Sequence, residues 1–337
     1  MGAIHTITLP RWGLSMESAR VNGWLRDVGA LVNAGEEILE VETEKIAGGV
    51  AAVAGGVLRR QLAQVGEVVP VGRLLGVVAD ADVPESEIDA VVADFRASFS
   101  VTSAVEAEAV ATPEKVVVGG RTLRYLRRGQ GSDVAILVHG FGGDLNNWLF
   151  NHEALAARRT VYALDLPGHG ESTKEVGAGT LSELAQAVAG FMDAVGVSSA
   201  HLAGHSLGGA VALALAAGEP QRVRSLALLA SAGLGTEINA GYIEGFVTAT
   251  NRNALKPHVV KLFADASRVT RRMIDDLLKY KRLEGVESSL RLLSERICSG
   301  GRQAMVLREE LARLRRPVLV IWGSEDQIIP ARHASGL

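Results

Sequence analysis

Short apolar runs separated by glycines fill the first eighty residues, and the same pattern occurs twice. Residues 28–41 ("VGALVNAGEEILEV") and residues 65–78 ("VGEVVPVGRLLGVV") match at an offset of 37 positions, with Gly35 matching Gly72. Glycines at such regular places can supply the positive φ that tight turns between short strands need. The repeat therefore predicts an all-β sandwich with internal pseudo-symmetry over residues 1–80.

The pattern changes after Asp80, where charge becomes more prominent. Residues 81–115 carry eight acidic and two basic side chains, a net charge of −6. Apolar positions at helical spacing behind a proline predict one short amphipathic helix; they are Ile88, Val91, Val92, Phe95 and Phe99. The stretch 100–113, rich in Ser, Thr, Ala and Glu, predicts an extended and solvated tether. We expect residues 81–115 to form an acidic linker between two domains.

From residue 116 onward, apolar strands alternate with helical segments. Strands ending in glycine-rich loops are expected within 134–143, within 160–172 and at the start of 198–217. This alternation predicts a doubly wound, mainly parallel sheet covered by helices on both faces. Residues 232–316 are too many for one crossover and show helical periodicity, so we expect a helical cap there. The cap carries 16 basic and 10 acidic residues, which indicates either a solvated helical surface or a lid that attracts an anionic cosubstrate.

Charge, hydropathy and cysteine content exclude several classes of protein. The 337 residues include 35 basic and 38 acidic side chains, so there is no electrostatic case for nucleic acid as a partner. No run of 18 apolar residues occurs, and no membrane span is predicted. Cys298 is the one cysteine, which excludes an internal disulfide and fits a reducing compartment. We expect a cytoplasmic protein that binds neither nucleic acid nor membrane and holds no metal.

A lysine stands at the midpoint of the repeat. The stretch Thr43-Glu44-Lys45-Ile46 joins the last strand of the first half to the first strand of the second, so Lys45 is expected at a protruding hairpin tip. This region resembles a lipoyl domain, in which a lysine on such a turn carries lipoate. Biotinyl domains share the fold but place the lysine between two methionines. The resemblance implies lipoate bound covalently to Lys45, and the alternative is an ordinary solvated lysine.

A serine motif lies between a predicted strand and a predicted helix. It reads Gly204-His205-Ser206-Leu207-Gly208. A serine on a tight strand-to-helix turn exposes its Oγ, and glycines two positions away on either side avoid clashes there. The motif arises often by chance, and it gains weight from the loops "HGFGG" and "DLPGHG" further upstream. Together the three motifs predict a nucleophile elbow.

Residues 116–337 resemble the α/β-hydrolase family in these motifs and in their order. The resemblance implies that Ser206 is the nucleophile and that the backbone N–H groups of Phe141 and Leu207 form the oxyanion hole. It also implies that Asp326, in "RPVLVIWGSEDQIIP", is the acid of the catalytic triad. An aspartate in such a place can instead serve a turn.

The triad's histidine is the point at which the sequence departs from the family. That histidine follows one further strand beyond the acid, whereas this chain stops 11 residues after Asp326. His333 lies seven residues past Asp326, where a helix is expected to begin, and is not expected to turn back to the nucleophile. We therefore expect the chain to end before its general base, as a fragment or a natural truncation. We expect His205 to line the pocket, and His139 and Asp165 to shape loops.

The pairing of the two domains has its own resemblance, which covers the whole chain. A lipoyl domain tethered to an α/β-hydrolase domain resembles the acetyltransferase components of acetoin dehydrogenase complexes. This implies acetyl transfer from S-acetyl-dihydrolipoyl-Lys45 to coenzyme A. It also implies a thiamine-diphosphate-dependent component that loads the arm, a dihydrolipoyl dehydrogenase that reoxidises it, and a homo-oligomeric core. Two alternatives stay open: a hydrolase of esters, thioesters or carbon–carbon bonds with a lipoyl delivery domain, and a noncatalytic swinging-arm scaffold.

Overall fold

The computed structural model describes residues 3–10, 16, 18–43, 46–106 and 112–337. The chain divides into two compact units, Met1–Thr112 and Pro113–Leu337. Each unit has its own hydrophobic core. None of the helices in the described ranges is long and apolar enough to cross a membrane.

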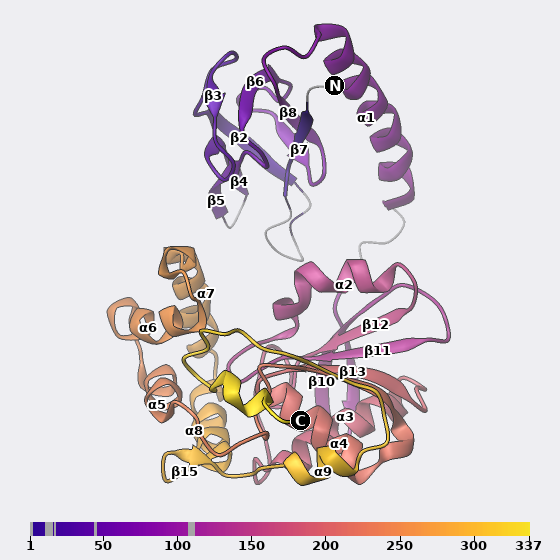
Figure 1. Cartoon of the computed structure of the whole chain (residues 1–337), viewed down its shortest axis with the longest axis vertical. Coiled ribbons are helices and arrows are strands. Elements are labelled where there is room, and N and C mark those ends of the chain that lie inside the picture. The colour runs from indigo at the N-terminus through magenta and orange to yellow at the C-terminus, as the bar shows by residue number, and fades with distance from the viewer. Residues whose placement is uncertain (1–2, 11–15, 17, 44–45, 107–111) are drawn as a thin grey trace. The chain divides into compact units, whose positions relative to one another are not determined.

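The first unit is a sandwich of two four-stranded sheets (Figure 1). One sheet has the order β1-β8-β6-β3 and the other has the order β5-β4-β2-β7. Their strands are β1 (Ile4–Thr8), β2 (Ser18–Trp24), β3 (Leu31–Val32), β4 (Glu37–Thr43), β5 (Ile46–Ala51), β6 (Gly56–Gln61), β7 (Val68–Pro70) and β8 (Leu74–Ala79). Alternate side chains of the two sheets meet in a core that includes Val21, Ile38, Leu58 and Leu75.

The sequence repeat appears in the backbone of this unit. The pair β3 and β4 recurs as β7 and β8 at the offset of 37 positions. Gly35 and Gly72, which match in the repeat, both have a φ of +81°, a value that a residue with a Cβ rarely adopts. The predicted pseudo-symmetric sandwich is confirmed.

The helix after the sandwich differs from the prediction. Helix α1 (Glu85–Glu106) has 22 residues, so it is longer than the short helix expected and takes up part of the stretch expected to be a tether. It packs on the sandwich, where Ile88 and Val92 join Leu74 and Val77 in a buried cluster. The guanidinium of Arg60 also pairs with Asp89 at 2.9 Å. Because an apolar strand face needs a cover, the helix belongs to the first unit and is not a free linker.

The second unit is built on a seven-stranded sheet of order β17-β14-β13-β11-β12-β10-β9. The five strands from β17 to β12 run parallel, while β10 and β9 are antiparallel additions. The strands are β9 (Glu114–Val118), β10 (Arg121–Arg128), β11 (Val134–Val138), β12 (Thr160–Leu164), β13 (Ala200–His205), β14 (Val223–Leu229) and β17 (Val318–Ile321). The helices between these strands are α2 (Leu149–Ala156), α3 (Leu181–Ala194) and α4 (Leu207–Gly218). This is the mainly parallel sheet with covering helices that the alternation predicted.

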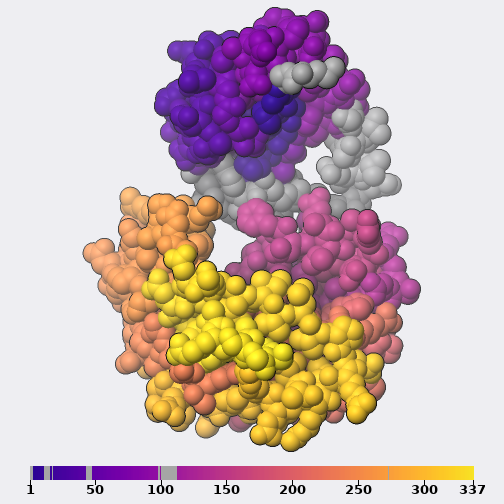
Figure 2. Space-filling view, viewed as in Figure 1, coloured from indigo at the N-terminus to yellow at the C-terminus, as the bar shows by residue number. Residues whose placement is uncertain are grey.

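Four helices between β14 and β17 form the cap. They are α5 (Ala240–Thr248), α6 (Arg252–Val259), α7 (Arg271–Lys281) and α8 (Val286–Ile297). A short hairpin of β15 (Cys298–Ser299) and β16 (Arg302–Gln303) follows, and then α9 (Arg308–Arg313). Helix α9 packs against α4, so the cap helices end earlier than the predicted boundary at residue 316. In Figure 2 the C-terminal residues, in yellow, form part of the surface of this unit beside the orange cap.

Candidate active site

Strands β4 and β5 of the first unit pair with Thr43 opposite Ile46. The predicted lipoyl attachment residue, Lys45, falls between these two positions and lies outside the described residues. Its modification therefore stays a prediction. The strands on either side are those that the repeat placed at its midpoint.

Ser206 stands at a sharp turn between β13 and α4. Its φ of 51° and ψ of −116° lie in a region that residues other than glycine rarely occupy. A Cβ added at Gly204 would collide with the backbone of Gly208. One added at Gly208 would collide with the carbonyl oxygens of Val138 and His139. The glycines of the motif are thus required by the close approach of three backbone segments, which is the geometry of a nucleophile elbow.

Backbone hydrogen bonds hold this strained turn in place. The N–H of Ser206 donates to the carbonyl of Leu229 at 3.0 Å. The carbonyl of Ser206 accepts from the N–H groups of Gly209 and Ala232, each at 3.0 Å. Such contacts from α4 and from the segment after β14 stabilise a conformation that costs about 1 to 3 kcal/mol by itself.

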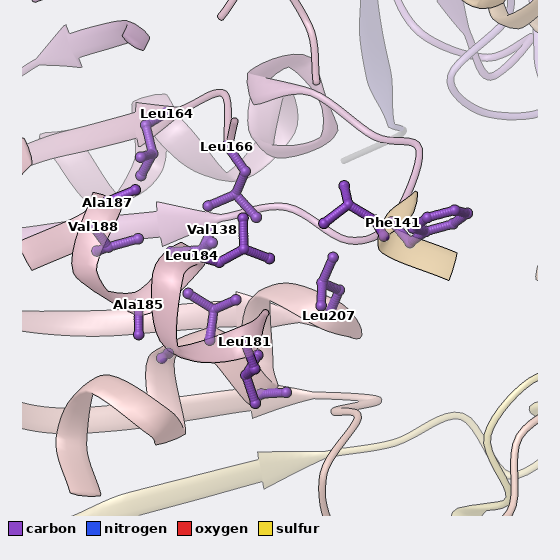
Figure 3. Close-up of a cluster of buried hydrophobic side chains, with 14 of the residues drawn as sticks. Val138, Phe141, Leu164, Leu166, Leu181, Leu184, Ala185, Ala187, Val188 and Leu207 are labelled. Carbon is purple, nitrogen blue, oxygen red and sulfur yellow. The ribbon is translucent and has the colours of Figure 1, made fainter. Parts of the chain in front are cut away.

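The two predicted oxyanion donors lie next to the serine. A Cβ added at Gly140 would lie 3.2 Å from Ser206 Cβ, so the chain passes the serine just before Phe141. Leu207 is the first residue of α4, and the first N–H groups of a helix have no partner inside it. In the described part of the chain, neither Phe141 N–H nor Leu207 N–H donates to a backbone carbonyl in a turn, loop or cap. Figure 3 shows both residues at the same end of the buried cluster, beyond Val138.

Asp326 follows β17 and serves a turn. Its Oδ1 accepts from the N–H groups of Ile328 at 2.8 Å and Ile329 at 2.9 Å. The carboxylate also lies close enough to His205 to affect that residue's pKa. The turn and an electrostatic role at the site are therefore compatible, because one carboxylate oxygen satisfies the turn and the second is left over.

His205 is exposed, yet nearby protein atoms remove part of the solvent around its imidazole ring. Desolvation holds the pKa of His205 below its usual value, the carboxylate of Asp326 opposes this effect, and His139 adds to it. Desolvation and His139 together therefore favour the neutral form of the imidazole. Its Nδ1 lies 2.9 Å from the position of a Cβ at Gly140, which places the ring against the oxyanion loop.

His333 is engaged by a carboxylate of the second unit. It is 4% exposed, and its Nε2 lies 2.6 Å from Oε2 of Glu237 at the start of the cap. Its ring also contacts the indole of Trp322, with the centroids 6.4 Å apart. Among the described residues, no histidine ring forms a hydrogen bond with Ser206 Oγ. The contact with Glu237 thus engages Nε2 of His333.

His139 and Asp165 shape the loops around the site, as expected. His139 Nε2 accepts from the N–H of Leu166 at 3.0 Å. Asp165 accepts from the N–H of Leu145 at 2.7 Å. Burial lowers the pKa of the neighbouring His169 to about 3, so this ring is a neutral packing residue. Within the described ranges, no group of three or more His, Cys, Asp or Glu side chains could hold a metal ion.

Sequence patterns did not identify the part that the cap plays at this site. Phe246 on α5 covers the oxyanion loop, with its Cζ 2.6 Å from the position of a Cβ at Gly142. Its ring centroid lies 6.1 Å from that of Phe141. No local motif marks a contact between residues about a hundred positions apart, so only the tertiary structure reveals it.

Comparisons with known proteins agree with both units. Residues 134–337 match the family model described as alpha/beta hydrolase fold, and residues 5–78 match the one described as biotin-requiring enzyme. The chain is 54% identical to the dihydrolipoyllysine-residue acetyltransferase component of the acetoin cleaving system of Pseudomonas putida, over 99% of this chain and 90% of that protein. The corresponding component of Cupriavidus necator is 49% identical, over 98% of this chain and 88% of that protein.

Two hydrolases are similar to about two thirds of the chain. A 2-hydroxy-6-oxononadienedioate/2-hydroxy-6-oxononatrienedioate hydrolase of Burkholderia vietnamiensis is 31% identical, over 64% of this chain and 79% of that protein. The solved structure of a meta-cleavage product hydrolase from Pseudomonas fluorescens superposes with a TM-score of 0.60 at 23% identity, covering 66% of this chain and 83% of that one. That structure shows the shared fold. With a lipoyl-type sandwich, a serine elbow and near full-length similarity to two such proteins, the chain belongs to the family of dihydrolipoyllysine-residue acetyltransferase components of acetoin cleaving systems.

Proposed function

We propose that this protein transfers an acetyl group from S-acetyl-dihydrolipoyl-Lys45 to coenzyme A. The observation that carries the proposal is a serine elbow beside two N–H donors in a chain that also has a lipoyl-type domain. A thioester carbonyl develops negative charge on oxygen when it is attacked, and donors fixed in advance stabilise that charge.

The chemistry divides into two steps at Ser206. In the first step Ser206 Oγ adds to the thioester carbonyl, the carbon–sulfur bond breaks, and the dihydrolipoyl thiol leaves with the proton from the serine. In the second step the coenzyme A thiol attacks the acetyl-serine ester, the carbon–oxygen bond breaks, and the proton of the thiol passes to the serine oxygen. The N–H groups of Phe141 and Leu207 stabilise the oxyanion in both steps.

The excess of positive charge on the cap favours an anionic acceptor. Residues 232–316 carry 16 basic and 10 acidic side chains. An open cavity of about 750 Å³ in the cap is lined by the cations of Lys281, Arg282 and Arg291 and by the carboxylates of Glu287 and Glu295, and cavities of this size hold small-molecule ligands. In the part of the chain that the structure describes, the Arg282 guanidinium has no ion-pair partner. It is therefore available to a phosphate group of coenzyme A.

We also propose the cofactor and the partner proteins of this enzyme. Lys45 carries lipoate, a thiamine-diphosphate-dependent acetoin dehydrogenase component loads the arm, and dihydrolipoyl dehydrogenase reoxidises it. The chains assemble into a homo-oligomeric core in the cytoplasm. Support for a multicomponent system comes from the names of the two full-length relatives, each of which is a component of an acetoin cleaving system.

Hydrolysis is the second candidate, and the similarity of the second unit to a hydrolase favours it. The two functions differ only in the acceptor, which is coenzyme A in one and water in the other. The third reading, a noncatalytic scaffold, predicts no turnover of acyl thioesters by either route. The products therefore separate all three.

The test measures acetyl-coenzyme A and free acetate side by side from lipoylated protein whose arm has been reductively acetylated. We expect acetyl-coenzyme A to dominate at saturating coenzyme A, and Ser206→Ala to lower transfer to the uncatalysed background while lipoylation stays intact. Ser132→Ala, which changes an exposed loop serine, is the matched control. Arg282→Glu should raise KM for coenzyme A with kcat unchanged. Predominant acetate supports the hydrolase, and indifference to Ser206→Ala supports the scaffold.

A further inference from the structure

Phe246 of the cap presses directly on the oxyanion loop. It is 2% exposed, and its ring lies where a side chain at Gly142 would begin. Gly142 has a φ of +72°, so the loop turns there in a conformation that suits glycine. The ring also meets that of Phe141 edge-on, at 63°. Phe246 therefore packs against the residue whose N–H we assign to the oxyanion hole.

Lys281, the last residue of α7, holds the end of α5 on which Phe246 lies. Its ammonium donates to the carbonyl of Phe246, to that of Val247 at 3.2 Å and to that of Ala249 at 2.5 Å. These carbonyls belong to the C-terminal end of α5, where a cation is favourable. The ammonium also lies 5.3 Å from the centroid of the Phe246 ring. Lys281 therefore fixes both the backbone and the ring of one residue.

Burying the Lys281 ammonium costs more free energy than an ordinary, solvent-exposed helix cap would. In the described ranges, Lys281 has no carboxylate within salt-bridge distance, and burial lowers its pKa to about 8, with Glu287 acting in the opposite direction. A half-buried cation with only carbonyl and ring partners costs free energy. A cap made for stability alone would not need an ammonium that also contacts the ring touching the active-site loop.

We infer that Lys281 is a positioning residue for acyl transfer: through Phe246 it holds the Phe141–Gly142 segment where its N–H meets the carbonyl oxygen. The inference rests on the proposed serine chemistry but not on the identity of the acceptor. Because an oxyanion donor acts on the transition state, displacing it lowers kcat and leaves KM for the acyl donor nearly unchanged. A displacement of a fraction of an ångström should cost about tenfold.

The first experiment uses p-nitrophenyl acetate as acyl donor, since this ester acylates the serine without lipoate or coenzyme A. Lys281→Met removes the charge and the donors but keeps an unbranched stem, and Lys281→Arg keeps a cation. Lys279→Met, on the same helix and exposed, is the matched control. We expect kcat to fall about tenfold in Lys281→Met, to recover largely in Lys281→Arg and to stay unchanged in Lys279→Met. Equal kcat in Lys281→Met and wild type overturns the inference.

A second readout does not depend on turnover. The chain has seven phenylalanines, so 4-fluorophenylalanine labelling gives a small set of ¹⁹F resonances that single substitutions can assign. We expect the Phe141 resonance to shift or broaden in Lys281→Met and in Phe246→Leu, a variant that keeps an apolar side chain on Gly142. An unchanged Phe141 resonance in both variants contradicts the inference, whichever product the enzyme makes. If Phe141 responds while acetate is the main product, the positioning role holds and the proposed acceptor is wrong.

Discussion

The two units of this protein place their chemistry in opposite ways. In the first unit the reactive lysine is expected between two strands that pair with each other, so neighbouring residues define the site. In the second unit the site gathers Phe141, Ser206, Phe246 and Asp326 from segments separated by many residues. A carrier therefore needs only an exposed attachment point that neighbouring residues define, whereas a transfer site needs several groups held together in space.

The largest expected effect separates the carrier from the transfer site. Lys45→Arg should abolish lipoylation and with it all transfer from the arm, because guanidinium cannot form the amide with lipoate. Acylation by p-nitrophenyl acetate should remain within about twofold of wild type, since the second unit has its own core. Intact-mass spectrometry and burst kinetics measure the two effects. Lipoate found on another lysine would contradict the assignment of Lys45 as the attachment residue.

The next effect concerns the dependence of the elbow on backbone contact. In Gly208→Ala the new methyl group meets the carbonyl oxygens of Val138 and His139, so the end of β11 and the oxyanion loop must shift. We expect a loss of about 1 to 3 kcal/mol in the stability of the second unit and a fall of about a hundredfold in kcat. Calorimetry and p-nitrophenyl acetate turnover test both. Wild-type turnover in Gly208→Ala would show that this close packing is unimportant for catalysis.

A third prediction tests whether α1 belongs to the carrier unit. Ile88 is fully buried against Leu74 and Val77, and Ile88→Ala should cost the first unit about 2 to 5 kcal/mol. The unfolding transition of the second unit should not move. Glu87→Ala, an exposed change on the same helix, is the control. A helix that behaves as a free linker would leave both transitions where they were.

The smallest expected effect is a pH dependence at the cap. Burial lowers the pKa of Lys281 to about 8 in the folded protein, against about 10.4 for a free lysine. Between these values the unfolded state binds more protons, so stability should rise with pH in this range. Glu287 acts on Lys281 in the opposite direction, and the nearby His258, whose own pKa is lowered by burial and by the charges of Lys261 and Lys281, carries no charge in this range. The Tm of the second unit should therefore rise with pH more in wild type than in Lys281→Met, with Lys279→Met as control.

Both domains could be predicted from sequence because each carries a pattern with a local cause. The offset of 37 positions repeats the φ of Gly35 at Gly72, and short-range sterics set that value. The same holds for Gly204 and Gly208, whose spacing around Ser206 expresses the turn itself. The role of Asp326 could not be predicted from the sequence in the same way, because an aspartate suits both a turn and a catalytic triad.

What the sequence determined by itself was therefore the repeat, the elbow and the order of the two units, all of which follow from backbone sterics and periodicity. Only the tertiary structure decided that α1 covers the sandwich, that Glu237 engages His333, and that Lys281 reaches the oxyanion loop through Phe246. The physical reason is the same in each case. These contacts join residues that no turn or helix period relates, and burial and hydrogen bonding select them only once the chain has packed.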